Sequence, residues 1–349
     1  MKVNGYATQT ATDKLTPFSF ERRTPRPDDV VIDILYCGVC HSDIHTARNE
    51  WGGTMYPCVP GHEIVGRVSQ VGDNVSQHKA GDMVGVGCLV DSCRTCSACN
   101  EGLEQYCEKG WTGTYNGVDK IGGTEFKQTL GGYSNFITVD QRYVLRLPEN
   151  LNPAAAAPLL CAGITAYSPL KHWKVGQGQK VGIIGLGGLG HMGIKFAHAM
   201  GAKVVMITTS PDKGKDAQRL GADEILISKD KSAMKAAMSS FDFLFNTIPV
   251  GHDTEPYMKL LKRDSTMVLV GSVEPLTKVN GVDFIFQRRN MAGSLIGGLP
   301  ETQEMLDFCS EHAIECDIEL IDIKDINTAY DRTVSGDVKY RFVIDMATL

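Results

Sequence analysis

The sequence lacks any apolar run long enough to cross a membrane, and its first residues, Met1–Tyr6, lack the apolar core of a signal peptide. It also lacks a cluster of basic residues, since 35 Lys and Arg stand against 41 Asp and Glu for a net charge of −6. We therefore expect neither a membrane nor a nucleic acid as partner. Because no signal peptide is expected, we expect a cytoplasmic protein. In that reducing compartment, clustered cysteines more often bind metal than form disulfides.

The length and the pattern of apolar residues indicate two domains of different kinds. A chain of 349 residues is too long for one typical core. Up to about residue 150 the sequence favours β-strands such as Val30–Cys37, separated by turns. From about residue 155, apolar strands alternate with helical stretches such as His191–Met200, which predicts an α/β domain with a parallel sheet and helices on both faces. The strands we expect there are Val181–Ile184, Val204–Ile207, Ile225–Ile227, Phe243–Phe245, Met267–Val270 and Leu295–Ile296.

Four cysteines crowd into one short stretch with the spacing C-x2-C-x2-C-x7-C: Cys93, Cys96, Cys99 and Cys107. Thiolates are soft anionic ligands, and a loop of turn-forming residues can wrap four of them around one zinc ion. Free or disulfide-bonded cysteines are the alternative. Because four thiolates leave no position for a substrate, we expect this zinc to stabilise structure and the chemistry to occur elsewhere.

A glycine-rich loop, Gly185-Leu186-Gly187-Gly188-Leu189-Gly190, follows one predicted strand and opens a predicted helix. In this context G-x-G-x-x-G typically binds a dinucleotide. Gly185 permits the tight turn, Gly187 lets the backbone approach the pyrophosphate, and Gly190 permits close helix packing. The helix N-terminus also favours the anion. A glycine-rich turn without a ligand is the alternative.

The end of the next strand decides between NAD and NADP. An NAD enzyme usually places Asp or Glu there to bind the ribose hydroxyls. The sequence instead has Thr208, Thr209 and Ser210, followed by Lys213. Hydroxyls and lysines suit a 2′-phosphate, so we expect NADP(H), bound by Thr209, Ser210 and Lys213. Asp212 argues for NAD, and surface lysines that only solvate a helix start are a further alternative.

A second set of metal ligands is spread over the segments Gly38–His45, Gly61–Gly66 and Leu159–Thr165. Taken singly, Cys40 or Cys161 is more often a small buried apolar residue than a ligand. A lone His62 would likewise more often be structural. Together they provide two thiolates and one imidazole, and such a set leaves the fourth zinc position open for a substrate oxygen.

With these segments the chain resembles the zinc-dependent medium-chain dehydrogenase/reductases, and among them the cinnamyl alcohol dehydrogenase group with its bacterial broad-range aldehyde reductases. The resemblance runs nearly end to end. Its most specific stretches are Gly38–His45, Tyr56–Glu63, Val84–Cys88, Ala157–Gly163, Gly185–Gly193 and Val338–Val343. It implies a GroES-like catalytic domain with the structural zinc lobe over 1–155, a Rossmann doubly wound sheet that binds NADP over 156–294, and a segment, 295–349, that returns to the first domain. An active site in the cleft between domains and a homodimer are also implied.

The resemblance further implies roles for individual residues. Cys40, His62 and Cys161 are the expected catalytic zinc ligands, with Asp43 and Glu63 orienting them. The expected proton relay consists of Ser42 and His45. The expected contact behind the nicotinamide ring is Thr165, and the expected substrate pocket is lined by Trp51, Cys88, Trp111, Leu295 and Ile296. Bulky indoles there suit aromatic or medium-size apolar aldehydes.

The sequence thus predicts an enzyme that transfers hydride between NADP(H) and primary alcohols or aldehydes, with one catalytic and one structural zinc. One alternative is an NAD-linked polyol dehydrogenase, against which the hydroxyl-rich strand end argues. The other is a nonenzymatic nucleotide-binding protein. Such a protein has no need for Cys40, His62, Cys161, Ser42 and His45 together.

Overall fold

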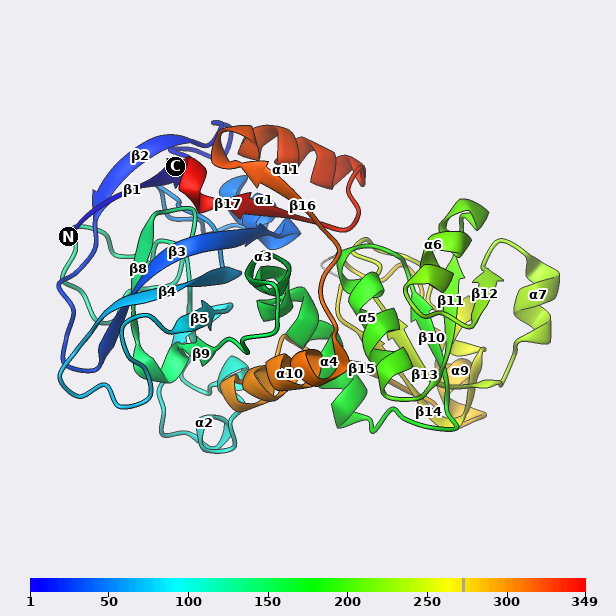
Figure 1. Ribbon diagram of the computed structural model, residues 1–349. Helices are drawn as coiled ribbons and strands as arrows, with labels where there is room; N and C mark the ends of the chain where they lie inside the picture. Colours follow the sequence, from blue (N-terminus) through cyan, green and yellow to red (C-terminus); the bar gives the residue numbers. More distant parts are fainter. Residues whose placement is uncertain (272–273) are drawn as a thin grey trace. The chain divides into compact units, whose positions relative to one another are not determined.

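The computed structural model describes residues 1–271 and 274–349, which form two compact units (Figure 1). Unit 1 comprises residues 1–164 and 297–349, and unit 2 comprises residues 165–296. Among the described residues, no helix combines the length and the apolar composition needed to span a membrane.

Unit 1 is built around a seven-stranded sheet in the order β16-β17-β3-β4-β5-β9, with β8 also paired to β3. The strands of unit 1 are β1 Lys2–Ala7, β2 Thr16–Glu21, β3 Asp29–Val39, β4 Ile64–Val71, β5 Met83–Val86, β6 Leu89–Asp91, β7 Thr112–Gly113, β8 Phe136–Asp140, β9 Leu145–Arg146, β16 Ile318–Asp322 and β17 Arg341–Asp345. Its helices are α1 His41–Ala47, α2 Ser97–Asn100, α3 Pro153–Ala156, α10 Leu299–His312 and α11 Ile326–Ser335. Its 3-10 turns are η1 Glu104–Tyr106, η2 Gln141–Tyr143, η3 Ala157–Leu160, η5 Ile323–Asp325 and η6 Met346–Thr348.

Strand β3 is the centre of this sheet. Most of its side chains are buried, as expected for its apolar, β-branched sequence. It pairs antiparallel with β4, β8 and β17, so that β17, from the end of the chain, lies directly beside β3 (Figure 1). Because antiparallel neighbours run in opposite directions, the end of β3 meets the beginnings of β4 and β17 at one edge of the sheet. That edge carries the candidate active site.

Unit 2 contains a six-stranded, all-parallel sheet in the order β12-β11-β10-β13-β14-β15. Its strands are β10 Lys180–Ile184, β11 Lys203–Thr208, β12 Glu224–Ile227, β13 Phe241–Asn246, β14 Leu261–Leu269 and β15 Asn290–Gly293. Its helices are α4 Ala162–His172, which begins in unit 1, α5 Gly188–Ala199, α6 Gly214–Arg219, α7 Lys231–Ala236, α8 Glu255–Met258 and α9 Gly281–Ile285, with the 3-10 turn η4 Pro211–Lys213. The predicted Rossmann-type parallel sheet is confirmed. The strand order reverses between β10 and β13, which is where dinucleotides bind in such sheets.

The strand predicted at Leu295–Ile296 is wrong. The sixth strand of the sheet is β15, Asn290–Gly293, and Ile296 instead has a left-handed backbone with a φ of 35°. The prediction relied on a run of buried apolar residues. An edge strand is exposed on one side, so β15 needs no such run, and its sequence Asn-Met-Ala-Gly gave no signal.

Candidate active site and metal centres

The four clustered cysteines form a cage. The Sγ atoms of Cys93, Cys96, Cys99 and Cys107 lie within 4.8 Å of one another. The Cys93–Cys99 distance is 3.9 Å and the Cys96–Cys107 distance is 4.0 Å. A tetrahedral zinc ion with Zn–S bonds of about 2.3 Å separates its sulfurs by about 3.8 Å, whereas a disulfide needs about 2 Å. The cage therefore fits a zinc ion and excludes disulfides among these cysteines.

Backbone amides help to hold the cage. The Cys96 amide donates to the Cys93 Sγ and the Cys93 amide donates to the Cys107 Sγ, each at 3.3 Å. Hydrogen bonds from the amides of Thr95 and Cys96 lower the pKa of Cys93 to about 6. A thiolate is the form that binds metal, so the loop favours the ligand state of this residue.

The second cluster lies at the edge of the unit 1 sheet. Cys40 directly follows β3 and precedes α1, whereas His62 and Glu63 directly precede β4. The pairing of Cys37 with Ile64 brings these two strand ends together. Cys161 follows η3, and its Sγ lies 3.9 Å from that of Cys40. All four residues are buried, and their ligand atoms lie within 4.8 Å of one another. This donor set fits one zinc ion.

Asp43 connects the ligands to the fold. Its carboxylate is fully buried and accepts hydrogen bonds from His62 Nδ1 at 3.0 Å, the Gly61 amide at 3.1 Å, the Cys40 amide at 2.9 Å and the Tyr133 hydroxyl at 3.2 Å. Because His62 donates from Nδ1, its Nε2 keeps a lone pair for a metal. The arrangement fixes both the tautomer and the orientation of the imidazole.

Glu63 lies among the ligand atoms. One of its carboxylate oxygens accepts a hydrogen bond from the buried Arg341 guanidinium. The other oxygen, Oε2, has no hydrogen-bond partner among the described residues. Gly38 is required beside it, since a Cβ at that position would collide with Oε2. Glu63 can therefore orient the ligands and can also reach a metal with its unpaired oxygen.

The protonation of the two thiols differs. The hydrogen bond with Cys161 lowers the pKa of Cys40 well below its ordinary value, against the effect of burial, and the charge of Arg341 adds to the lowering. The same hydrogen bond raises the pKa of Cys161. Cys40 is thus the thiol that ionises first and provides the first anionic ligand.

Ser42 and His45 lie on α1, immediately after Cys40. The Ser42 Oγ is 3.6 Å from the Cys40 Sγ. The His45 ring stacks on Trp51, with centroids 5.0 Å apart, and its Nδ1 forms a hydrogen bond with the Glu50 carboxylate. That bond leaves Nε2 of His45 available for a second partner. Trp51, predicted to line the substrate pocket, is 51% exposed and supports His45.

The glycine-rich loop of unit 2 connects β10 to α5 at the point where the strand order reverses. Gly185 has a φ of 94°, which only glycine adopts readily, and a Cβ at Gly190 would collide with the Gly185 carbonyl. Gly187 precedes α5, and a Cβ there would meet nothing within 4 Å. The loop therefore exposes its backbone and the N-terminus of α5, including Gly188 and Leu189, to a ligand.

The residues predicted to select the cofactor follow β11. Thr209 and Lys213 are exposed, and Ser210 is partly buried. The Lys213 Nζ lies 3.5 Å from the Leu186 carbonyl oxygen, so this ammonium group reaches the glycine-rich loop. Asp212, which in the sequence argued for NAD instead of NADP, is exposed on η4.

Comparison with known proteins identifies the family. An alcohol dehydrogenase GroES-like domain model matches residues 26–149, and a zinc-binding dehydrogenase model matches residues 188–311. The aldehyde reductase YahK of Escherichia coli is 56% identical over 353 aligned residues, which cover 100% of this chain and 99% of that protein. The chain is a zinc-dependent alcohol dehydrogenase of the cinnamyl alcohol dehydrogenase-like group.

Two further relatives of this dehydrogenase bear on its cofactor. NADP-dependent alcohol dehydrogenase C 1 of Mycolicibacterium smegmatis is 51% identical and covers 99% of each chain. The crystal structure of a Helicobacter pylori cinnamyl alcohol dehydrogenase complexed with NADP(H) has a TM-score of 0.92 and 44% identity, and covers 99% of both chains. The GroES-like and Rossmann architecture predicted from the sequence is confirmed.

The remaining predicted residues of the dehydrogenase are placed as follows. In unit 1, Cys88 forms a hydrogen bond with the Cys161 thiol that lowers the pKa of Cys88, and Trp111 is partly buried. In unit 2, Thr165 is buried on α4, Leu295 is 45% exposed, and Ile296 lies in the turn after β15. Cys88 is therefore the predicted pocket residue that the structure brings to the catalytic cluster.

Three residues at the site of the dehydrogenase were missed from the sequence. Arg341 could have been found, because it begins a strand whose next three residues are apolar and a buried guanidinium needs an anion. Glu50 stands five residues after His45 in an ordinary turn, and Tyr133 follows a Gly-Gly pair. Neither of these two positions carries a signal of its own.

Proposed function

We propose that this chain is a zinc-dependent aldehyde reductase and alcohol dehydrogenase that uses NADP(H) and acts on aromatic or medium-size apolar substrates. The single observation that carries the proposal is the buried Cys40–His62–Cys161 cluster, whose histidine is oriented by Asp43. With Cys40, His62 and Cys161 as ligands, the fourth coordination position, which Glu63 can also reach, is available to a substrate oxygen, as a catalytic zinc requires. Relatives named aldehyde reductase and NADP-dependent alcohol dehydrogenase support the same activity.

The residues of this chain have different proposed roles in the reaction. When bound, zinc supplies Lewis-acid polarisation of a carbonyl oxygen. Ser42, beside Cys40, passes a proton through its hydroxyl, and His45 exchanges that proton with solvent. Glu50 and Trp51 hold the His45 ring, so that one nitrogen stays directed to the relay. Asp43 and Glu63 keep the ligands in place.

The cofactor proposal rests on unit 2. The glycine-rich loop offers its backbone to a pyrophosphate, and Thr209, Ser210 and Lys213 take the place of the acidic residue that binds the ribose of NAD. The Lys213 ammonium group lies against that loop, where it can pair with a 2′-phosphate. The crystal structure with NADP(H) and the name of the mycobacterial relative support this choice.

The residues proposed to contact the substrate are Trp51, Cys88 and Trp111 in unit 1 and Leu295 and Ile296 in unit 2, and Thr165 of unit 2 is proposed to contact the nicotinamide ring. Cys88 has the most direct support, since it contacts Cys161. Indoles and aliphatic side chains favour apolar or aromatic substrates over polyols.

Initial rates with benzaldehyde test the proposal. We expect reduction that is faster with NADPH than with NADH and that is lost after metal chelation. Replacing Lys213 by alanine should raise the KM for NADPH about tenfold, since a charge-assisted contact is worth about 1.5 kcal/mol or more, and should leave the KM for NADH unchanged. A preference of the unchanged enzyme for NADH would contradict the cofactor proposal, and activity on polyols alone would favour the polyol dehydrogenase.

A homodimer is proposed from one face of unit 2. Strand β15 is an edge strand, and the segment that precedes it in the sequence exposes Val282 and Ile285 on α9 and Phe286 directly after α9, the last two at 78% and 76%. An edge strand and a group of exposed apolar side chains are each typical of an interface, and a second copy of this chain offers the same groups.

A negative charge introduced among these exposed apolar side chains should prevent two copies of the chain from associating. We expect Phe286→Asp to convert a dimer into a monomer in light scattering after size-exclusion chromatography, because a buried unpaired carboxylate opposes association. Val334→Asp on α11 places the same charge at another exposed apolar residue and should leave the mass unchanged. A Phe286→Asp variant that stays dimeric would rule out this interface.

A cytoplasmic location is proposed from the thiols. All eleven cysteines in the described parts of the chain are free, and six of them belong to the two metal clusters. Thiolate ligands of this kind persist in a reducing compartment.

A further inference from the structure

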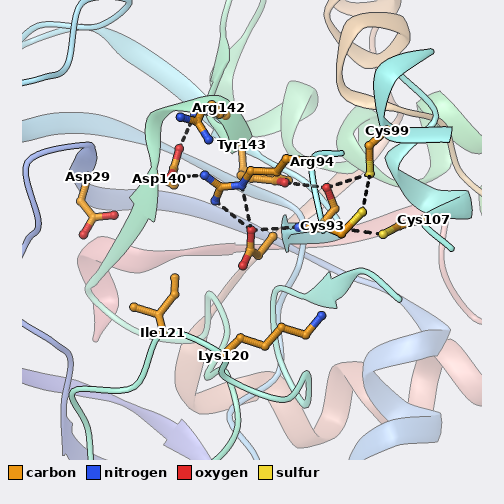
Figure 2. A network of polar contacts seen from close by, with 12 residues as sticks. Asp29, Cys93, Arg94, Cys99, Cys107, Lys120, Ile121, Asp140, Arg142 and Tyr143 are labelled. Atoms are coloured by element: carbon orange, nitrogen blue, oxygen red, sulfur yellow. Dashed lines mark hydrogen bonds and ion pairs between the residues drawn. The ribbon is translucent and has the colours of Figure 1, made fainter. Parts of the chain in front are cut away.

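A chain of hydroxyl groups leads from the body of unit 1 to the four-cysteine cage. The Tyr143 hydroxyl lies 2.8 Å from the Ser92 Oγ, and the Ser92 Oγ lies 3.3 Å from the Cys99 Sγ (Figure 2). Tyr143 and Ser92 are both buried. Tyr143 belongs to η2, which follows β8, whereas Ser92 stands between β6 and Cys93. The two hydroxyls therefore link the cage to a separate part of the fold.

The donors in this chain follow from the charge of the metal-bound sulfur. A cysteine that binds zinc is a thiolate and can only accept a hydrogen bond. Ser92 has a single hydroxyl proton, which it must then donate to Cys99. Its oxygen is left as the acceptor for Tyr143, whose hydroxyl is the donor. Tyr143 thus donates to Ser92, and Ser92 donates to the Cys99 sulfur.

Arg94 contacts Tyr143, the end of this series of hydroxyl groups that is farther from the zinc cage. Its guanidinium lies over the Tyr143 ring, 5.3 Å from the ring centroid. It donates to the Asp91 carboxylate at 2.8 Å and to the Asp140 carboxylate at 2.9 Å (Figure 2). Asp91 accepts from the Ser92 amide at 2.9 Å, and Asp140 is the last residue of β8. Arg94 therefore fixes both the tyrosine ring and the backbone of Ser92.

We propose that Tyr143 and Ser92 form a hydroxyl relay that donates to the Cys99 thiolate of the structural zinc site, and that Arg94 positions this relay. The relay withdraws charge from Cys99, which lowers its reactivity toward electrophiles and slows zinc loss. The other three cysteines receive no side-chain hydroxyl bond of comparable length in the described structure, because Thr95 lies 3.8 Å from the Cys93 Sγ and is exposed. Groups that hold metal ligands in this way typically change metal affinity 10- to 100-fold when removed.

The test measures alkylation of the holoenzyme at each cysteine. N-ethylmaleimide is added, the modified cysteines are resolved by peptide mass spectrometry, and zinc loss to a chromogenic chelator is followed in parallel. We expect Ser92→Ala to accelerate both Cys99 alkylation and zinc loss about tenfold. Tyr143→Phe, which keeps the ring under Arg94, should accelerate them about threefold, since it removes the more distant bond.

Two controls separate a relay from general loosening of the lobe. Thr95→Ala removes the long, exposed hydroxyl contact to Cys93 and should change neither rate by more than about twofold. In the double variant Ser92→Ala/Tyr143→Phe, the tyrosine substitution should add nothing, because its hydroxyl acts only through Ser92. Equal acceleration at all four cysteines, an additive double variant, or unchanged rates in Ser92→Ala would each overturn the proposal.

Discussion

Replacing Cys40 by serine is expected to abolish aldehyde reduction while the fold and NADPH binding persist. The hydroxyl of serine is a poor zinc ligand at neutral pH, and the cluster is left with one thiolate and one imidazole. Zinc contributes several kcal/mol of transition-state stabilisation, so we expect kcat to fall by a factor of about 1,000 or more. Initial rates give the activity, metal analysis should show one zinc per chain instead of two, and NADPH fluorescence reports binding.

Cys58→Ser is the matched control for this variant. Cys58 is also buried in unit 1, and its thiol belongs to neither metal cluster. The control variant should therefore keep both zinc ions and most of its activity. Full activity in Cys40→Ser, or loss of both zinc ions from it, would contradict the assignment of Cys40 to a separate catalytic site.

Replacing Arg341 by methionine is expected to destabilise unit 1 by about 3–5 kcal/mol, because it leaves the Glu63 carboxylate buried without the positive charge that pairs with it. Glu63 is fully buried, and its hydrogen bond among the described residues comes from Arg341. A zinc ion bound by two thiolates is neutral overall, so it does not replace the lost charge. The midpoint of urea unfolding, followed for the zinc-loaded protein, measures the effect.

Arg332→Met removes the same charge from exposed ion pairs with Glu319 and Asp337 and should cost about 1 kcal/mol or less. The double variant Arg341→Met/Glu63→Gln should recover part of the loss, because a neutral amide is less costly to bury than a carboxylate. If Arg341→Met is no less stable than Arg332→Met, the buried pair does not stabilise unit 1.

The parts of the site that are local in sequence were predicted best. Cys93 to Cys107 span a single loop, so their spacing alone constrains their geometry, and the cage observed has the expected sulfur separations. The glycine-rich loop is likewise one turn between a strand and a helix. In both cases the chemistry and the backbone conformation are specified by residues within one short segment.

The parts that depend on distant strands were not predictable in the same way. Arg341 reaches Glu63 across 278 residues, and no spacing rule relates them. Their meeting depends on the pairing of β17 with β3, which a pattern of apolar residues does not specify. The misplaced strand at Leu295–Ile296 has a similar cause, since an edge strand is defined by its neighbour β14 and not by its own composition.

The pairing of β3 with β17 also has a consequence for synthesis on the ribosome. The residues of unit 2 are continuous, so this unit can fold as soon as residue 296 has left the exit tunnel. Strand β3 is made before unit 2, but its neighbour at residues 341–345 is made after unit 2. β8 can pair with the beginning of β3 before then, but the end of β3 at Tyr36–Val39 lacks its β17 partner, so the nascent chain carries a short open strand edge that can pair with other chains. Chaperone binding during translation is therefore most useful to the first half of this protein, although that half is the first to emerge.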